Sequence, residues 1–150
     1  MATCFSPLAS PDAKILILGS FPGKESLRKQ EYYAHPRNAF WSIIRILFRL
    51  EDSLSYLERV KALKSNRVAL WDVLLSCQRE GSLDSSIDDT TISVNDFTLF
   101  FRKYKEIQWV FFNGLKQKKN IKDGLCLWLV RFVILFSIVD YPRRVRLWRC

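Results

Sequence analysis

The stretch KILILG at 14–19 decides the fold class of this protein. It is a short run rich in Ile and Leu, and it ends in a loop that contains Pro22 and Gly23. Such a run predicts a buried strand that leads into a tight turn. Two further apolar runs, RVALWDV at 67–73 and IQWVFF at 107–112, have the same character. The sequence therefore predicts a sheet of buried strands.

Amphipathic segments separate these strands along the chain. Apolar residues recur at helical spacing in 38–50 and in 54–64, and a short helix is expected at 97–105. The polar stretch at 81–96, GSLDSSIDDTTISVND, is expected to be mostly loop. Strands that alternate with helices are typical of parallel βαβ units. The predicted fold class is therefore α/β, with a doubly wound sheet.

Charge divides the chain into two unequal parts. The 150 residues carry a formal net charge of +9. Residues 1–116 contain 16 Lys and Arg against 13 Asp and Glu, whereas residues 117–150 contain 8 against 2. Two-thirds of the excess positive charge therefore lies in the last 34 residues. This C-terminal segment differs in composition from the rest and needs its own explanation.

The sequence gives no sign of a membrane protein or of a metal site. No apolar run reaches the roughly 18 residues of a membrane span, and the N-terminus lacks the pattern of a secretory signal. We therefore expect a cytoplasmic protein. The four cysteines are far apart in the sequence and His35 is the only histidine, which predicts free thiols, no metal and no serine–histidine–aspartate triad.

Three short polar positions follow the predicted strands. They are the loop at 19–23, the Trp71-Asp72 pair and the Asn113-Gly114 pair. Ligands of doubly wound sheets bind beyond the C-terminal ends of the strands, so these positions predict a pocket for a polar, uncharged or anionic ligand. Each also has a structural interpretation, because Gly, Pro and Asn are common turn residues.

Two residues after the first loop could contact a phosphate. Lys24 and Ser26 lie where the N–H groups of a following helix would support an anion. A solvated surface turn is an equally good interpretation of Lys24. The loop lacks the glycine spacing of dinucleotide and triphosphate sites, so neither ligand is indicated.

Four motifs resemble one branch of a known enzyme superfamily. They are GSFPGKESL at 19–27, QEYYAHPRNAFW at 30–41, VALWDVLLSCQREGSLDSSI at 68–87 and VFFNG at 110–114. Together they closely resemble the hypoxanthine-DNA glycosylase branch of the uracil-DNA glycosylase superfamily, over about residues 14–116. The resemblance implies a three-layer α/β/α domain with a short, mainly parallel central sheet. It also implies removal of a deaminated base from DNA without a metal or organic cofactor.

Asn38 is the catalytic candidate that the resemblance supplies. Other branches of the superfamily carry a carboxylate or Asn in the first loop, where this sequence has Phe21, and the Asn of HPRN is understood to take over that role. An amide can position a water and can stabilise charge on the departing base. The alternative is that Asn38 caps the helix before Phe40, and both roles can hold together.

The resemblance also assigns residues to base recognition and to the DNA backbone. Phe21 could supply an aromatic face for the flipped base, and Asn113 would read the base. The predicted base-binding residues are Gly19, Ser20, Phe21, Pro22, Gly23 and Asn113, and the predicted DNA-backbone residues are Lys24, Ser26 and Arg37. For Arg37 the alternative to a phosphate contact is an ion pair within the protein.

The last motif of this branch is missing from the chain as written. In relatives a C-terminal loop resembling LPSTSPA inserts into the duplex. When the possible codons for residues 140–148 are read two bases later, they permit LPSTSPA in order. We therefore expect a glycosylase-like domain at 1–116 followed by an aberrant segment at 117–150 in a shifted reading frame. The alternative is a divergent but genuine C-terminus.

These observations predict a DNA glycosylase of base excision repair. Its partner would be DNA that contains a deaminated base, with hypoxanthine as the first candidate and uracil as the second. We expect a monomer that has no membrane contact. The alternative is a catalytically impaired relative that at most binds DNA weakly, mainly through the basic C-terminal segment.

Overall fold

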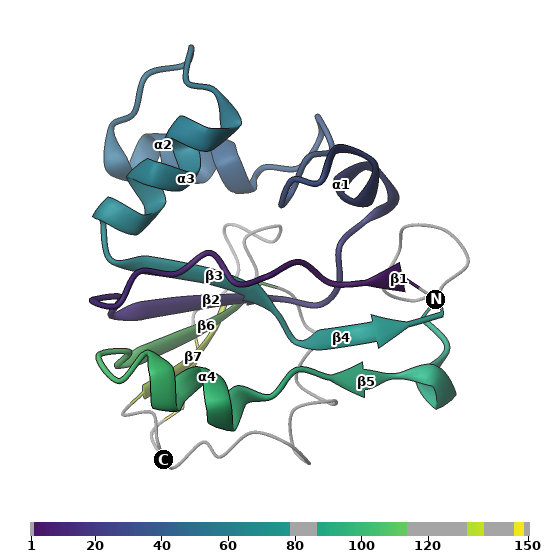
Figure 1. Ribbon diagram of the computed structural model, residues 1–150. Coiled ribbons are helices and arrows are strands. Elements are labelled where there is room, and N and C mark those ends of the chain that lie inside the picture. Colours follow the sequence, from purple (N-terminus) through teal and green to yellow (C-terminus); the bar gives the residue numbers. More distant parts are fainter. Residues whose placement is uncertain (1, 79–86, 114–131, 137–145, 149–150) are drawn as a thin grey trace.

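A five-stranded sheet forms the centre of the protein (Figure 1). The computed structural model describes residues 2–78, 87–113, 132–136 and 146–148. The strand order is β3-β2-β6-β7-β8; the first four strands are parallel to their neighbours, and β8 is antiparallel to β7. The bounds are β2 Ile15–Gly19, β3 Val68–Asp72, β6 Trp109–Asn113, β7 Phe132–Phe136 and β8 Arg146–Trp148.

Helices cover both faces of this sheet. Figure 1 shows α1, α2 and α3 above the sheet and α4 below it. The bounds are α1 Lys24–Lys29, α2 Phe40–Phe48, α3 Tyr56–Ser65 and α4 Phe97–Lys103. The predicted three-layer α/β/α architecture with a mainly parallel sheet is confirmed. The three helices expected from periodicity form within the predicted segments, or within one residue of them.

A small antiparallel sheet was not predicted from the sequence. It has the order β1-β4-β5, with β1 at Ala2–Thr3, β4 at Leu74–Cys77 and β5 at Ser93–Val94. Only Val73 separates β3 from β4, so the second apolar run continues into another sheet. Two of these strands have two residues, which is too short for an alternating pattern to be visible. Within the predicted loop, 87–96 contain a short 3-10 helix at Asp89–Thr91 besides β5, whereas 81–86 lie outside the described residues.

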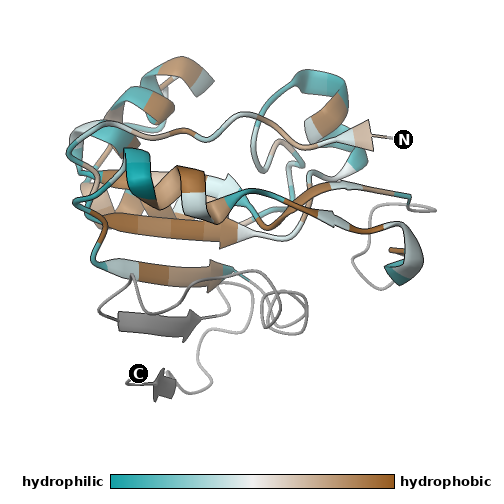
Figure 2. Cartoon of the chain, turned by 60° about the horizontal axis from the view of Figure 1, so that its bottom comes forward, coloured by the Kyte–Doolittle hydropathy of each residue, from teal (hydrophilic) through white to brown (hydrophobic). Residues whose placement is uncertain are grey.

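Two apolar clusters hold the helices against the sheet. On one face Leu16, Leu18 and Val110 pack with α4, and on the other Leu70 packs with the buried side of α2 and α3. Every residue of β3 is buried. Figure 2 shows the hydrophobic colouring of the central strands that results. Each fully buried Leu of this kind stabilises the fold by about 1.5–3 kcal/mol relative to an exposed one.

The start of α3 offers a test of local stabilisation. The Ser55 hydroxyl accepts a hydrogen bond from the Glu58 backbone N–H at 3.4 Å, and the Glu58 carboxylate accepts one from the Ser55 N–H at 2.7 Å. This capping box satisfies two amide groups that have no partner within the helix. We expect Ser55→Ala to lower the free energy of unfolding by about 1 kcal/mol, measured by urea denaturation. Ser65→Ala, at the other end of α3, is the control, and an equal loss there would contradict the capping role.

Candidate active site

The carboxyl ends of three parallel strands meet at one edge of the central sheet. In the pairing of β2 with β3, Gly19 lies opposite Asp72, and in the pairing of β2 with β6, Leu18 lies opposite Phe112. Asn113 therefore follows at the same edge. We call this edge, formed by Gly19, Asp72 and Asn113, the rim. All three polar positions singled out in the sequence lie at it or directly beside it.

The loop after Gly19 is held firmly to the start of the small sheet. The Gly19 carbonyl accepts a hydrogen bond from Val73 N at 2.9 Å, and the Ser20 carbonyl accepts one from Leu74 N at 3.0 Å. Phe21 is only 7% exposed and belongs to the apolar cluster on the α4 side of the sheet. The loop thus presents a fixed backbone, and stacking of a base on Phe21 stays a prediction.

Gly19 is the point on the rim where two polar side chains converge. A Cβ built on Gly19 would lie 2.4 Å from Asp72 Oδ1 and 2.9 Å from the Tyr33 hydroxyl oxygen. Real Cβ atoms do not approach other atoms this closely. By contrast, a Cβ on Gly23 would meet no atom within 4 Å. The missing side chain of Gly19 therefore creates the space in which the carboxylate and the hydroxyl face the same point.

The segment between α1 and α2 brings Tyr33 to the rim. Tyr33 has a φ of 54°, and its ring stacks on Phe40 with 4.2 Å between centroids. Next to it, the Tyr32 carbonyl accepts a hydrogen bond from Trp41 Nε1 at 2.7 Å. These contacts tie the segment to the first turn of α2. The position of Tyr33 is thus fixed by packing that is remote in sequence from Gly19.

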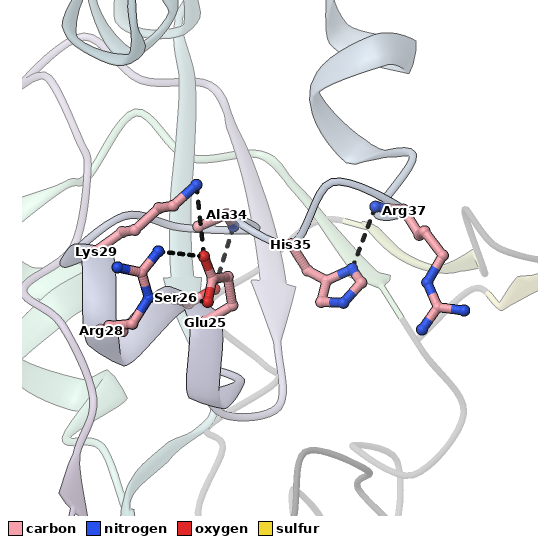
Figure 3. Close-up of polar contacts among 7 residues, drawn as sticks. All are labelled: Glu25, Ser26, Arg28, Lys29, Ala34, His35 and Arg37. Carbon is pink, nitrogen blue, oxygen red and sulfur yellow. Dashed lines mark hydrogen bonds and ion pairs between the residues drawn. The ribbon is translucent and has the colours of Figure 1, made fainter.

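Ser26 is hydrogen-bonded to this segment between α1 and α2. Its side chain is 5% exposed, and its hydroxyl accepts a hydrogen bond from the Ala34 N–H at 3.2 Å (Figure 3). The sequence suggested Ser26 as a DNA-backbone contact. In the structure its hydroxyl holds a turn of the protein by accepting this bond. The hydroxyl hydrogen is not used by that bond, so contact of Ser26 with a phosphate stays a prediction.

Asn38 lies at the entrance to α2. Its Oδ1 accepts a hydrogen bond from Phe40 N at 2.9 Å, and its own N–H donates to the His35 carbonyl at 2.8 Å. The helix N-cap is Ala39, so Asn38 supports the first turn from one residue further out. No hydrogen bond within the described part of the chain uses Nδ2 of Asn38. Support of the first turn of α2 therefore accounts for Oδ1 of the amide and not for Nδ2. The catalytic role of Asn38 stays a prediction.

Two exposed cations lie beside these residues. Lys24 is the first residue of α1, and Arg37 directly precedes Asn38. The Arg37 N–H donates to His35 Nδ1 at 3.1 Å, and its guanidinium extends away from that ring (Figure 3). Among the described residues no acidic side chain lies within 4 Å of Arg37, so nothing there supports the alternative of an internal ion pair.

The other cations of α1 are already paired. Glu25 contacts Arg28 at 2.6 Å and Lys29 at 3.5 Å. The hydrogen bond from Arg28 is the main reason why the pKa of Glu25 falls to about 2, and the charges of Arg28 and Lys29 add to it. Arg28 and Lys29 are therefore partly neutralised by the protein itself, in contrast to Arg37.

One residue of the site, Tyr33, had no role in the sequence analysis and appeared there only as part of a motif. Asp72 belonged to one of the three positions that predicted a pocket, but it was given no task of its own. Asp72 is 3% exposed, and its backbone carbonyl accepts a hydrogen bond from Asn95 Nδ2 at 2.8 Å. Burial, and after it the negative charge of Asp72, raises the pKa of the Tyr32 hydroxyl far above its ordinary value. A carboxylate at the end of an apolar strand was the available signal for Asp72.

The chemical character of the rim is that of a hydrogen-bonding site. Amides, a carboxylate, a phenol and backbone groups lie on or beside it. In the part of the chain that the structure describes, no group of three or more His, Cys, Asp or Glu residues could hold a metal ion. No helix in that part is long and apolar enough to cross a membrane. The arrangement can bind and orient a flat polar ligand.

Comparisons with known proteins identify the family of this chain. The sequence profile of the uracil DNA glycosylase superfamily matches residues 6–128. A hypoxanthine DNA glycosylase from Methanosarcina barkeri (strain Fusaro / DSM 804) is 40% identical over 113 residues, which cover 75% of this chain and 70% of the relative. One from Methanosarcina acetivorans is 42% identical over 114 residues, with the same coverage.

A solved structure supports the same assignment. A Methanosarcina acetivorans protein, provisionally named a uracil DNA glycosylase and solved by NMR, superposes with a TM-score of 0.67 at 36% identity. The match covers 79% of this chain and 75% of that protein. The family profile, the sequence relatives and the fold all agree. The chain belongs to the uracil DNA glycosylase superfamily.

Proposed function

We propose that this protein is a DNA glycosylase that hydrolyses the N-glycosidic bond of a deaminated base, with hypoxanthine as its first substrate and uracil as its second. The observation that carries the proposal is the rim, where Gly19, Asp72 and Asn113 meet beside the Asn38 segment. The names of the two curated relatives support hypoxanthine as the base.

The chemistry requires a flipped nucleotide and a positioned water. The target base leaves the stack and enters a pocket that reads its pairing edge. Asn38 Oδ1 has two lone pairs, and the bond from Phe40 N–H uses one of them and fixes the amide. The second lone pair can accept from the water that attacks the sugar, while Nδ2 can donate to the departing base. An amide suffices when the glycosidic bond breaks before the water attacks.

The loop at 19–23 and Asn113 would hold the base, and exposed cations would hold the DNA. In this proposal Gly19 and Gly23 allow close backbone approach, Ser20 and Pro22 shape the wall, and Phe21 supplies apolar contact. Lys24, Ser26 and Arg37 would bind phosphates of the DNA backbone. We also propose that the protein acts as a monomer, and the DNA substrate supports a cytoplasmic location.

An oligonucleotide assay tests the function directly. Strands that contain one inosine or one uracil are incubated with the protein and then cleaved with alkali at abasic sites. We expect the inosine strand to be cut and the uracil strand to be cut more slowly. If a folded protein cuts neither strand, the glycosylase proposal fails and the impaired relative becomes the better description.

The alternative function, that of a catalytically impaired relative, is argued from the C-terminal segment. We propose that 117–150 are translated in a shifted frame, because this segment carries 8 Lys and Arg against 2 Asp and Glu and lacks an LPSTSPA-like loop. The family match ends within it, at residue 128. The chain nevertheless adds β7 and β8 to the sheet, while 137–145, which include the start of the shifted motif, lie outside the described residues.

Resequencing the coding DNA across codons 110–150 tests the shifted frame. A correction of one or two bases that restores LPSTSPA would support it, and the corrected chain should then be the active enzyme. An unchanged frame would overturn it. In that case we expect weak DNA binding that falls steeply with salt, because the basic segment would bind by releasing counterions from the phosphates.

The cation at residue 37 gives a quantitative prediction for DNA binding. We expect Arg37→Gln to weaken binding equally for all sequences and to reduce the slope of log K against log salt by about 0.9, as for one lost phosphate contact. Fluorescence anisotropy at several salt concentrations measures this slope. Arg28→Gln is the matched control, because Glu25 already pairs with Arg28. An equal slope change in both variants would contradict the assignment.

A further inference from the structure

One residue, His35, holds the turn that leads into Asn38. The Asn38 N–H donates to the His35 carbonyl at 2.8 Å, and the Arg37 N–H donates to His35 Nδ1 at 3.1 Å (Figure 3). Pro36, which follows His35 directly, has no N–H to donate. Every backbone N–H of the three residues after His35 therefore donates to His35. Its main chain and its side chain together fix the turn.

This turn carries two residues of the proposed function. In that proposal Arg37 binds a phosphate and Asn38 positions the water. At the far end of the turn, Asn38 Oδ1 accepts from Phe40 N at 2.9 Å, and Phe40 is fully buried in the core. Only the end at His35 lies on the surface. A shift of that end would move both residues relative to the rim, and a misplacement of about 1 Å can cost a reaction about 10²-fold.

The hydrogen bond to the ring determines which protonation state of His35 holds the turn. Because Nδ1 accepts from the Arg37 N–H, it carries no proton, and the neutral ring has its hydrogen on Nε2. An imidazolium has a hydrogen on both nitrogens and cannot accept. Histidine is the side chain that ordinarily changes charge between about pH 5 and 8. The bond therefore exists only while the ring is neutral.

The surroundings of the His35 ring offer no charged partner. In the ranges that the structure describes, no carboxylate from any element lies within 4 Å of the ring as an ion pair. The charged groups of α1 drawn in Figure 3, Glu25, Arg28 and Lys29, contact one another. The Arg37 guanidinium extends away from the ring. The Arg37 N–H is thus the one polar contact of the ring within those ranges, and protonation would break it.

We propose that His35 is a positioning residue of the glycosylase, and that its neutral ring holds Arg37 and Asn38 in the geometry that DNA binding and base release require. This inference rests on the proposed function, because it assigns the support of the catalytic residue named there. An asparagine side chain would accept the same bond from the N–H two residues further on at every pH. Histidine makes the bond conditional, so the enzyme is active with a neutral His35 and impaired with a charged one.

NMR tests the first half of this inference without DNA. His35 is the only histidine of the chain, so its ring nitrogens give unambiguous signals in the full chain labelled with ¹⁵N-histidine. At pH 8 we expect Nδ1 to be unprotonated and Nε2 to carry the hydrogen. On acidification the Arg37 amide proton should shift with the same midpoint as the ring. A proton on Nδ1 at pH 8, or an Arg37 signal that does not follow the ring, would overturn the inference.

His35→Asn and His35→Ala test the second half by single-turnover cleavage of an inosine duplex. At pH 8 we expect the wild type and His35→Asn to react at similar rates and His35→Ala to react about 3–10-fold more slowly, the effect of one lost hydrogen bond. At an acid pH where NMR shows the ring protonated, the wild type should fall to the rate of His35→Ala, while His35→Asn keeps its advantage. Comparing variants at one pH cancels any effect of pH on the DNA itself.

Gln30→Ala is the matched control. The exposed Gln30 also makes a local bond to the backbone, from Nε2 to the Leu27 carbonyl at 2.7 Å, so its variant should keep the wild-type rate at both pH values. A constant ratio of the wild type to His35→Asn at the two pH values, or a wild-type rate in His35→Ala at pH 8, would contradict the role of His35. A protein that cuts no inosine DNA would instead defeat the proposed function, and the NMR result would still decide whether the neutral ring holds the turn.

Discussion

Asn38→Ala lowers the rate of base release by about 10²–10³-fold, which is the loss typical of removing one preorganised polar group from a reacting centre. We expect this because, in the proposed mechanism, both ends of the amide act on the reaction: Oδ1 would position the water and Nδ2 would stabilise the departing base. Single-turnover cleavage of an inosine duplex measures the rate. Binding of the same duplex should change little, because Asn38 contributes no charge to the DNA backbone contacts.

Two further variants separate catalysis from helix support in this prediction. Asn38→Ser keeps an oxygen that can accept from Phe40 N but removes the amide, so it should keep the melting temperature and still lose the rate. Asn66→Ala removes an exposed amide whose Nδ2 donates to the Ala62 carbonyl, and it should leave the rate unchanged. If Asn38→Ser cleaves at the wild-type rate, Asn38 is only a support for α2.

Gly19→Ala has the second largest expected effect. The new methyl carbon would lie 2.4 Å from Asp72 Oδ1 and 2.9 Å from the Tyr33 oxygen, so one or both side chains must move. Asp72 has a short side chain on a fixed strand, and little space is available to it. We expect the free energy of unfolding to fall by about 1–3 kcal/mol, as for overpacking elsewhere. We also expect a loss of inosine cleavage greater than that destabilisation explains, because the proposed base-binding loop that begins at Gly19 is displaced.

Gly23→Ala is the matched control for this substitution. A Cβ at this position meets no atom within 4 Å, and its φ of −67° suits any residue. The free energy of unfolding should therefore stay close to that of the wild type. The measurements are urea denaturation of both variants and, for Gly19→Ala, single-turnover cleavage at a temperature where the variant is fully folded. Equal free energies of unfolding in the two variants would show that the space above Gly19 is not needed.

The sequence predicted the strands and helices that carry the site because their patterns are local. The run at 14–19 is apolar throughout and becomes β2, and the helical spacing from Phe40 onward becomes α2. The small sheet escaped prediction because its strands are defined by pairing of Ala2 with Cys77 and of Leu74 with Val94, which are far apart in the chain. The hydrogen bond between Ser26 and Ala34 escaped prediction for a similar reason, since the turn after α1 brings the two residues together.

What the sequence alone determined was the class of sheet, the positions of the strand ends and the motifs of the family, because each depends on neighbouring residues. The tertiary structure decided which side chains meet at those ends. Gly19, Tyr33 and Asp72 converge only because β2 and β3 pair in parallel register and because Phe40 holds the Tyr33 ring. Such convergence depends on register and packing between distant segments, and no local pattern encodes it.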